Sequence, residues 1–199
     1  WSQLLLALTA QLPVILLGSI YGTKVAGIFG LANSMVNLPM DLIGQSVAQV
    51  YYAEISKYGK DNRPRIYSLS LSISKKLLLF GMIPTVFFIL FGTQFFSIVF
   101  GNEWHEAGTY AQLLSIYVLF RFISAPIMNC LNVLEKHALQ LKFNISRIIL
   151  LLLIFYISYK LKLTINSTIF FYSIINGILY LLIIVQTFIF LKPKNPDAK

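Results

Sequence analysis

Six long apolar segments, separated by short polar connections, dominate this sequence. They cover roughly residues 4–20, 25–52, 77–91, 110–133, 145–159 and 169–191. A helix needs about 20 mostly apolar residues to cross a bilayer. We therefore predict an all-α integral membrane protein with six transmembrane helices.

The low content of charged residues excludes the usual alternative, a soluble domain. Only 12% of the residues are charged and 57% are hydrophobic, whereas about a quarter of the residues in a soluble domain are charged. One soluble core cannot hide so much apolar surface behind so few charges, so a soluble enzyme is not expected.

Four prolines lie inside the apolar segments, at positions 13, 39, 84 and 126. Proline usually ends a soluble helix, but membrane helices tolerate it because neighbouring groups satisfy the freed carbonyl. We expect kinks within spans.

Residues 67–74 alternate polar and apolar side chains as a strand does. A lone strand has no partner here, so we expect a helical start to the third span. Residues 95–100 are too few to span alone and are expected along the outer interface.

The basic residues predict the topology. The net charge of +9 would suggest a nucleic-acid partner in a soluble protein, but in a membrane protein it marks loops that stay in the cytoplasm. Three lysines lie on one set of connections: Lys24, Lys160 and Lys162. Twelve basic residues lie on the alternate set: Lys57, Lys60, Arg63, Arg65, Lys75, Lys76, Lys136, Lys142, Arg147, Lys192, Lys194 and Lys199. We therefore expect a cytoplasmic C-terminal tail at residues 192–199 and no nucleic-acid partner.

The beginning of the chain suggests a longer protein. It starts at Trp1, with no methionine and no charged region before the first apolar segment. We expect no signal peptide and interpret the chain as the later part of a larger protein.

Polar residues recur every fourth position in the second segment. At about 100° per residue each step drifts by about 40°, so the five side chains form one slanted ridge. Polar groups are expensive in hydrocarbon. The ridge therefore either hydrogen-bonds neighbouring helices or lines a water-filled cavity, and five polar groups including a carboxylate favour the cavity. The ridge comprises Asn33, Asn37, Asp41, Gln45 and Gln49.

Two ionisable residues are expected near mid-membrane, Asp41 and Arg121. Arg121 shares one helical face with Tyr117, Ser124, Met128 and Asn132. It either pairs with a carboxylate such as Asp41, snorkels, or supplies a fixed positive charge for an anion, and its planar fork suits phosphate. Asp41 either pairs, lines the cavity, or takes up a proton coupled to transport. The predicted substrate pathway is Asn33, Asn37, Asp41, Gln45, Gln49, Tyr117, Arg121 and Asn132.

No pattern typical of catalysis or metal binding is present. The two histidines, His105 and His137, lack metal-ligand spacing, and the one cysteine, Cys130, lies in an apolar run. No nucleophile elbow, P-loop, dinucleotide fingerprint or pair of catalytic carboxylates occurs. We expect no catalytic residue, no metal and no cofactor.

Three stretches resemble a known family. Residues 38–44, with Gln49-Val50 and Glu54-Ile-Ser56, resemble the eighth membrane helix of bacterial polysaccharide-precursor flippases. Residues 100–108 resemble the outward loop between their ninth and tenth helices, and residues 131–135 resemble the cytoplasmic end of the tenth. These proteins form the oligosaccharide flippase branch of the multidrug/oligosaccharidyl-lipid/polysaccharide exporter superfamily.

The resemblance implies a transporter of two six-helix lobes. Residues 1–191 would be the C-terminal lobe, and the N-terminal lobe of the same protein would be its missing partner. The implied activity is export of undecaprenyl-diphosphate-linked oligosaccharide across the bacterial inner membrane by alternating access, for surface polysaccharides such as O-antigen. A flippase breaks no bond, so no enzyme is implied. In this family the first two helices of each lobe line the cavity, and Arg121 becomes a hypothetical diphosphate contact.

Two alternatives remain. A multidrug exporter of the same superfamily would need more acidic and aromatic groups in its cavity for cationic drugs. A membrane-embedded glycan polymerase or glycosyltransferase would need a large outward loop with catalytic carboxylates or arginine clusters. The outward loops here are short.

Overall fold

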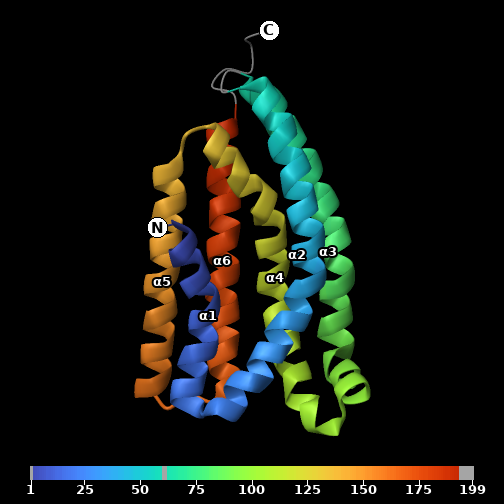
Figure 1. Cartoon of the computed structure of the whole chain (residues 1–199), viewed down its shortest axis with the longest axis vertical. Helices are drawn as coiled ribbons and strands as arrows, with labels where there is room; N and C mark the ends of the chain where they lie inside the picture. Colours follow the sequence, from blue (N-terminus) through green and yellow to red (C-terminus); the bar gives the residue numbers. More distant parts are fainter. Residues whose placement is uncertain (1, 60–61, 193–199) are drawn as a thin grey trace.

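The structure is a computed structural model that describes residues 2–59 and 62–192, with side chains from residue 11 onward. All secondary structure in these ranges is helical, which confirms the all-α prediction (Figure 1). The helices are α1 (Ser2–Tyr21), α2 (Thr23–Tyr58), α3 (Arg63–Phe100), the short 3-10 helix η1 (Asn102–Trp104), α4 (His105–Val133), α5 (His137–Lys160) and α6 (Ile165–Leu191).

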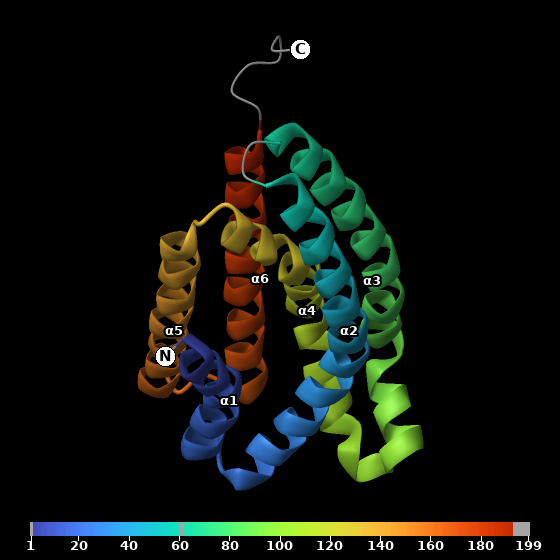
Figure 2. The ribbon, with the colours of Figure 1, turned by 45° about the horizontal axis from the view of Figure 1, so that its top comes forward.

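Helix α4 forms the centre of the bundle. It packs against α2, α3 and α6, and Figure 2 shows α2 and α3 on one side of it and α1, α5 and α6 on the other. Its fully buried side chains, among them Leu114, Val118 and Leu131, meet apolar side chains from all three neighbours. The centre of the bundle is thus mainly an apolar core.

Four helical segments are long and apolar enough to cross a membrane: α3, residues 102–133 including η1 and α4, α5 and α6. Helix α2 is not among them, because polar side chains recur along it. The described part of α1 that counts as apolar, Gln11–Tyr21, is too short. The six predicted helices are therefore present, while membrane-spanning character is supported for four of them.

The local sequence patterns resolve as helix. All four prolines lie inside helices, at positions 13, 39, 84 and 126, as expected for membrane-type kinks. Residues 67–74 are helical within α3, so their alternating polar and apolar pattern does not mark a strand.

Residues 95–100 correct one expectation. They do not form a separate segment but complete α3, which ends at Phe100, and their place along the outer interface stays a prediction. The physical reason is aromatic packing: Phe96 is fully buried and stacks with Phe100 at a centroid distance of 5.5 Å. Burial of these rings against the bundle keeps the last turns of α3 on the protein.

The connections divide between the two ends of the molecule. The α2–α3 and α4–α5 connections and the end of α6 lie at one end, and the α1–α2, α3–α4 and α5–α6 connections lie at the other (Figure 1). The predicted basic connections therefore share one end. Three of the twelve basic residues counted there lie outside the described residues, namely Lys60, Lys194 and Lys199, together with the rest of the predicted tail after Lys192.

The other end, which we call the turn end, is built from tight turns and hydrogen bonds. Gly22 and Gly101 have φ values of 97° and 99°, a left-handed conformation in which a side chain would be strained. The Tyr21 hydroxyl donates to the Leu163 carbonyl at 2.9 Å and lies 2.7 Å from the Thr168 hydroxyl. These contacts fix the end of α1 against the start of α6.

Candidate functional site

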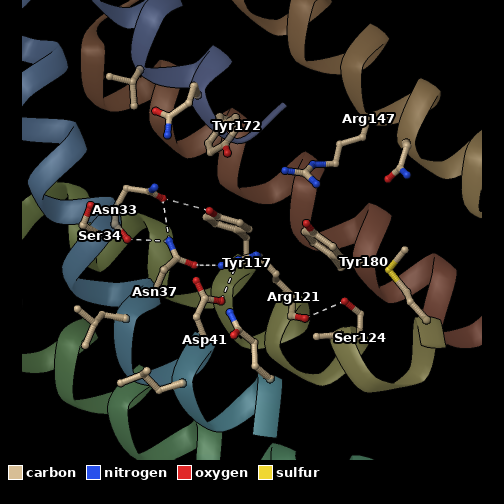
Figure 3. Close-up of a pocket in the computed structure, with 18 of the residues that line it drawn as sticks. Asn33, Ser34, Asn37, Asp41, Tyr117, Arg121, Ser124, Arg147, Tyr172 and Tyr180 are labelled. Carbon is tan, nitrogen blue, oxygen red and sulfur yellow. Dashed lines mark hydrogen bonds and ion pairs between the residues drawn. The ribbon is translucent and has the colours of Figure 1, made fainter. Parts of the chain in front are cut away.

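A cavity of about 810 Å³ lies between α1, α2, α4, α5 and α6 (Figure 3). The polar ridge of α2 forms one wall and the Arg121 face of α4 forms another. The structure thus brings together six of the eight residues predicted to line a substrate pathway. They are Asn33, Asn37, Asp41, Gln45, Tyr117 and Arg121.

The two ionisable residues predicted at mid-membrane form an ion pair. Arg121 Nη2 lies 2.8 Å from Asp41 Oδ1, and the side chains are 32% and 42% exposed. Arg121 Nη1 also donates to Asn37 Oδ1. The pairing alternative is therefore present in the structure, but the exposure leaves both groups accessible from the cavity.

Asparagines extend this pair into a network that joins α2 to α4. The Asn37 amide donates to Asn33 Oδ1 at 2.9 Å and to the Asn33 carbonyl at 2.7 Å. The Tyr117 hydroxyl donates to the same Asn33 Oδ1 at 3.2 Å. Interhelical hydrogen bonding and cavity lining, the two alternatives for the ridge, thus coexist: Asn33 and Asn37 bond across helices while lining the cavity.

Gly44 helps to bring the two helices together. Its missing side chain leaves space for the Phe122 ring, which would lie 3.3 Å from a Cβ at that position. Close contact here places the ridge of α2 opposite Tyr117, Arg121, Ser124 and Met128, which all face the cavity from α4 at the predicted helical spacing.

Two predicted pathway residues, Gln49 and Asn132, do not line this cavity. Gln49 is exposed and Asn132 is half-buried. Gln49 lies eight residues after Asp41, about 12 Å further along α2, and Asn132 lies in the last turn of α4. Both are near the basic end of the bundle, beyond the cavity wall.

Arg147 is the most important residue that the sequence pattern assigned differently. The charge count placed it in the basic connection, but it lies inside α5 and lines the cavity. Its guanidinium carbon is 5.5 Å from the centroid of the Tyr180 ring, and its buried Nε has no hydrogen-bond partner among the described residues. Within the part of the chain that the structure describes, no carboxylate pairs with it.

Further polar groups from α1, α5 and α6 complete the wall: Gln11, Asn144, Tyr172 and Tyr180. A sequence signal for them existed. Asn144 and Arg147 are three residues apart, and Tyr172 and Tyr180 are eight apart with Asn176 between them, so each set shares one helical face. The periodicity rule applied to the second segment also applies to these two.

The charge balance of the cavity favours an anion. Its lining contains one acid, Asp41, against two bases, Arg121 and Arg147, so the wall carries one net positive charge. Among the described residues no group of three potential metal-binding side chains occurs. Polar amides and tyrosine hydroxyls surround the charges and offer hydrogen bonds without adding charge.

Comparison with known proteins identifies the family of this chain. Residues 1–109 match the model of the family described as "Polysaccharide biosynthesis protein". The chain is 25% identical over 143 residues to the lipopolysaccharide biosynthesis protein WzxC of Escherichia coli K12, covering 70% of this chain and 28% of WzxC. It is 27% identical over 125 residues to the teichuronic acid biosynthesis protein TuaB of Bacillus subtilis 168, covering 63% of this chain and 26% of TuaB. No solved structure matches significantly.

These matches confirm the resemblance drawn from the three sequence stretches. The matched region spans only about a quarter of the length of each relative. Together with the four apolar helices long enough to cross a membrane, the matches support a multi-pass membrane protein whose relatives are named for polysaccharide biosynthesis. The chain belongs to the polysaccharide biosynthesis protein family.

Proposed function

We propose that the chain is the C-terminal six-helix lobe, residues 1–191, of a flippase in the bacterial inner membrane. The flippase moves polyprenyl-diphosphate-linked oligosaccharide across the membrane by alternating access, and it makes or breaks no covalent bond. One observation carries the proposal: a polar cavity with one net positive charge lies within a bundle of apolar helices, in a polysaccharide biosynthesis family.

The chemistry of the cargo matches this arrangement. A diphosphate is a strong anion, and arginine binds phosphate oxygens through two parallel hydrogen bonds. Arg147 offers a cation that has no carboxylate partner among the described residues, and Arg121 can exchange Asp41 for phosphate at an accessible position. The amides of Asn33, Asn37 and Gln45 suit sugar hydroxyls, while the polyprenyl tail stays in the lipid. Asp41 remains the candidate site for a coupling proton.

The orientation follows from the basic end. Lys57, Arg63, Arg65 and Lys136 are among the exposed or half-buried basic residues there, and the positive-inside rule places such an end in the cytoplasm. The C-terminus is then cytoplasmic.

The remainder of the transporter would close the cavity. Helix α2 exposes Ser34, Leu38, Leu42 and Gln45 along the cavity side, a surface of two leucines between two polar side chains. A second lobe from the same protein, facing this surface, would complete a central pathway. The matched region covers about a quarter of the length of each relative. The rest of a protein of that length is long enough to contain such a lobe.

The cavity charge argues against one of the two alternatives, and the short α3–α4 connection argues against the other. A pathway for cationic drugs would carry negative charge, whereas this one is positive. A glycan polymerase would need a large outward loop, whereas the α3–α4 connection consists of Gly101 and the three residues of η1. Membrane lipids and the lipid-linked oligosaccharide are the proposed partners.

The decisive experiment restores the full-length gene to its own host after removal of that host's glycan flippase. Surface glycan is measured for the native protein and for Asp41→Asn, Arg121→Ala and Arg147→Gln at matched expression. Lys142→Gln is the control, because it removes an exposed cation from α5 outside the cavity. We expect export with the native protein and the control, and at least a tenfold loss with each arginine variant. Absence of export with the native gene would refute the function, and full export with all three variants would refute the pathway.

A further inference from the structure

A second cavity, of about 550 Å³, lies at the turn end of the bundle. Thr23, Lys24, Gly27 and Ile28 line it from the first turns of α2, and Glu103 and Trp104 line it from η1. We propose that this outer cavity is a carbohydrate subsite, which holds sugar rings of the cargo while the diphosphate occupies the large cavity. This inference rests on the proposed function and adds the part of the cargo that determines specificity.

The chemistry of the lining suits a sugar ring. The indole of Trp104 is half-buried and lies beside the Phe100 ring at a centroid distance of 6.4 Å, so an aromatic group borders the cavity. Aromatic faces bind the apolar C–H faces of sugars, and a few convergent polar groups fix the orientation of a ligand. A carboxylate accepts and an ammonium donates hydrogen bonds, which matches ligand hydroxyls. Ile28 supplies a buried apolar floor.

The charge balance distinguishes this subsite from the large cavity. Lys24 and Glu103 are both exposed, and their charges cancel. Neither side chain makes an ion pair or hydrogen bond with another described residue, so both remain available to a ligand. A neutral wall with free donors and acceptors favours hydroxyl groups over a diphosphate, whereas the large cavity with its excess positive charge favours the diphosphate.

A continuous face of α2 connects the two cavities. Thr23, Gly27, Gly30 and Ser34 are spaced four, three and four residues apart, which places them on one side of the helix. Gly27 borders the outer cavity and Gly30 borders the large one. A Cβ at either glycine would meet no atom within 4 Å, so open space continues along this face.

The separation of the two sites points to an oligosaccharide. Lys24 and Asp41 are 17 residues apart, or about 25 Å along a helix. A chain of several sugar rings attached to a diphosphate at Arg121 reaches the outer cavity along α2, whereas a monosaccharide does not. The subsite therefore contacts sugars distant from the diphosphate.

Saturation-transfer NMR on the full-length protein in lipid nanodiscs tests the subsite, because this method detects weak binding. Two probes are used: the phosphate-free oligosaccharide repeat released from the host's surface glycan, and inorganic pyrophosphate, whose binding is followed by phosphorus NMR. We expect Trp104→Leu to weaken oligosaccharide binding about tenfold and to leave pyrophosphate binding unchanged. We expect Arg121→Gln to do the reverse.

Two exposed substitutions protect the test against a folding artefact. Glu103→Gln and Lys24→Gln alter surface side chains, so the fold is retained, and each should weaken oligosaccharide binding several-fold. Glu106→Gln is the matched control, because Glu106 is an exposed acid three residues after Glu103 that does not line the cavity. The Glu106→Gln variant should bind both probes as tightly as the native protein does.

The outcomes separate the subsite from the function. Absence of oligosaccharide binding to the native protein, or equal binding by Trp104→Leu, Glu103→Gln and Lys24→Gln, overturns the subsite even if glycan export is intact. Loss of oligosaccharide binding in these variants supports the subsite even if pyrophosphate fails to bind, a result that would count against the diphosphate site of the proposed function instead.

Discussion

At the residue scale, the ion pair of Asp41 and Arg121 poses a question of role. If the pair mainly holds α2 to α4, the coupling free energy between the two side chains should be large. If a ligand can open the pair, that coupling free energy should be small. The side chains of Arg121 and Asp41 are 32% and 42% exposed, which places the pair with accessible ion pairs, whose coupling is small because water screens the charges.

A double-mutant cycle of Asp41→Asn and Arg121→Gln tests this difference. We expect a coupling free energy of about 1 kcal/mol or less, measured by thermal unfolding of the full-length protein in detergent. Each single variant should still lose export, because each changes the charge of the cavity. A coupling of about 3 kcal/mol or more, the range of a buried structural pair, would contradict a ligand-opened pair.

Glycan export should depend on Arg147, whereas the stability of the protein should not. Its buried Nε has no hydrogen-bond partner among the described residues, and a buried polar group without a partner lowers stability. Arg147→Gln is therefore expected to keep or raise the melting temperature while it abolishes glycan export. Lys142→Gln on the same helix should change neither quantity. A lower melting temperature with normal export would assign Arg147 a structural role.

The difference between Asp41 and Arg147 explains what the sequence could predict about the site. Asp41 was predictable because its ridge repeats every four residues within one apolar segment. Arg147 was missed because the topology count treated it as a loop charge, although it lies within the fifth predicted apolar segment, residues 145–159. The start of α5 at His137 follows from the turn at residues 134–136, where Glu135 adopts a φ of 54°.

At the element scale, the contact of α3 with α4 depends on the absence of side chains. A Cβ on Gly108 would lie 2.4 Å from Thr93 Cα and 2.6 Å from the Gly92 carbonyl oxygen. Both neighbours are backbone atoms, so the clash is relieved only by moving the helices apart. This close approach also positions η1 and its Trp104 at the turn end.

Gly108→Ala should therefore destabilise the protein by about 1–3 kcal/mol, the usual cost of overpacking, as measured by unfolding in denaturant. Gly30→Ala is the matched control, because a Cβ there meets no atom within 4 Å. Alanine in an open helical position is more favourable than glycine by about 1 kcal/mol, so this variant should be slightly more stable. Equal effects of the two substitutions would contradict the close contact.

The number and order of the helices were predictable, while their lengths were not. Apolar runs locate the part of each helix inside the lipid. For α3 the apolar run begins near Leu77 and a helical start was expected over residues 67–74, but the helix begins at Arg63. The additional turns are amphipathic. Ile66 and Ser70 are buried, and Ser70 lies 2.6 Å from the hydroxyl of buried Tyr51 on α2. Such helix-to-helix contacts depend on tertiary packing, which hydropathy does not record.

At the scale of the whole molecule, the α2–α3 hairpin extends beyond the other helices at the basic end (Figure 1). Helix α3 has 38 residues, or about 57 Å, against about 30 Å of hydrocarbon. If Phe100 lies at one interface, Lys76 is about 36 Å away and lies just past the other. In the proposed topology, the stretch from Arg63 to Lys76 then projects into the cytoplasm, and the turn end with its outer cavity faces the opposite side.

Labelling with a membrane-impermeant maleimide tests this orientation. Ser56→Cys marks the basic end and Asn102→Cys marks the turn end, since both residues are exposed. Cys130 is buried, and an inaccessible thiol does not react, so it serves as the internal unlabelled control once cysteines elsewhere in the full-length protein are replaced. We expect Asn102→Cys to react in spheroplasts and Ser56→Cys only after permeabilisation. Labelling in the reverse order would invert the topology, place the proposed sugar subsite in the cytoplasm, and require the cargo to meet Trp104 before rather than after translocation.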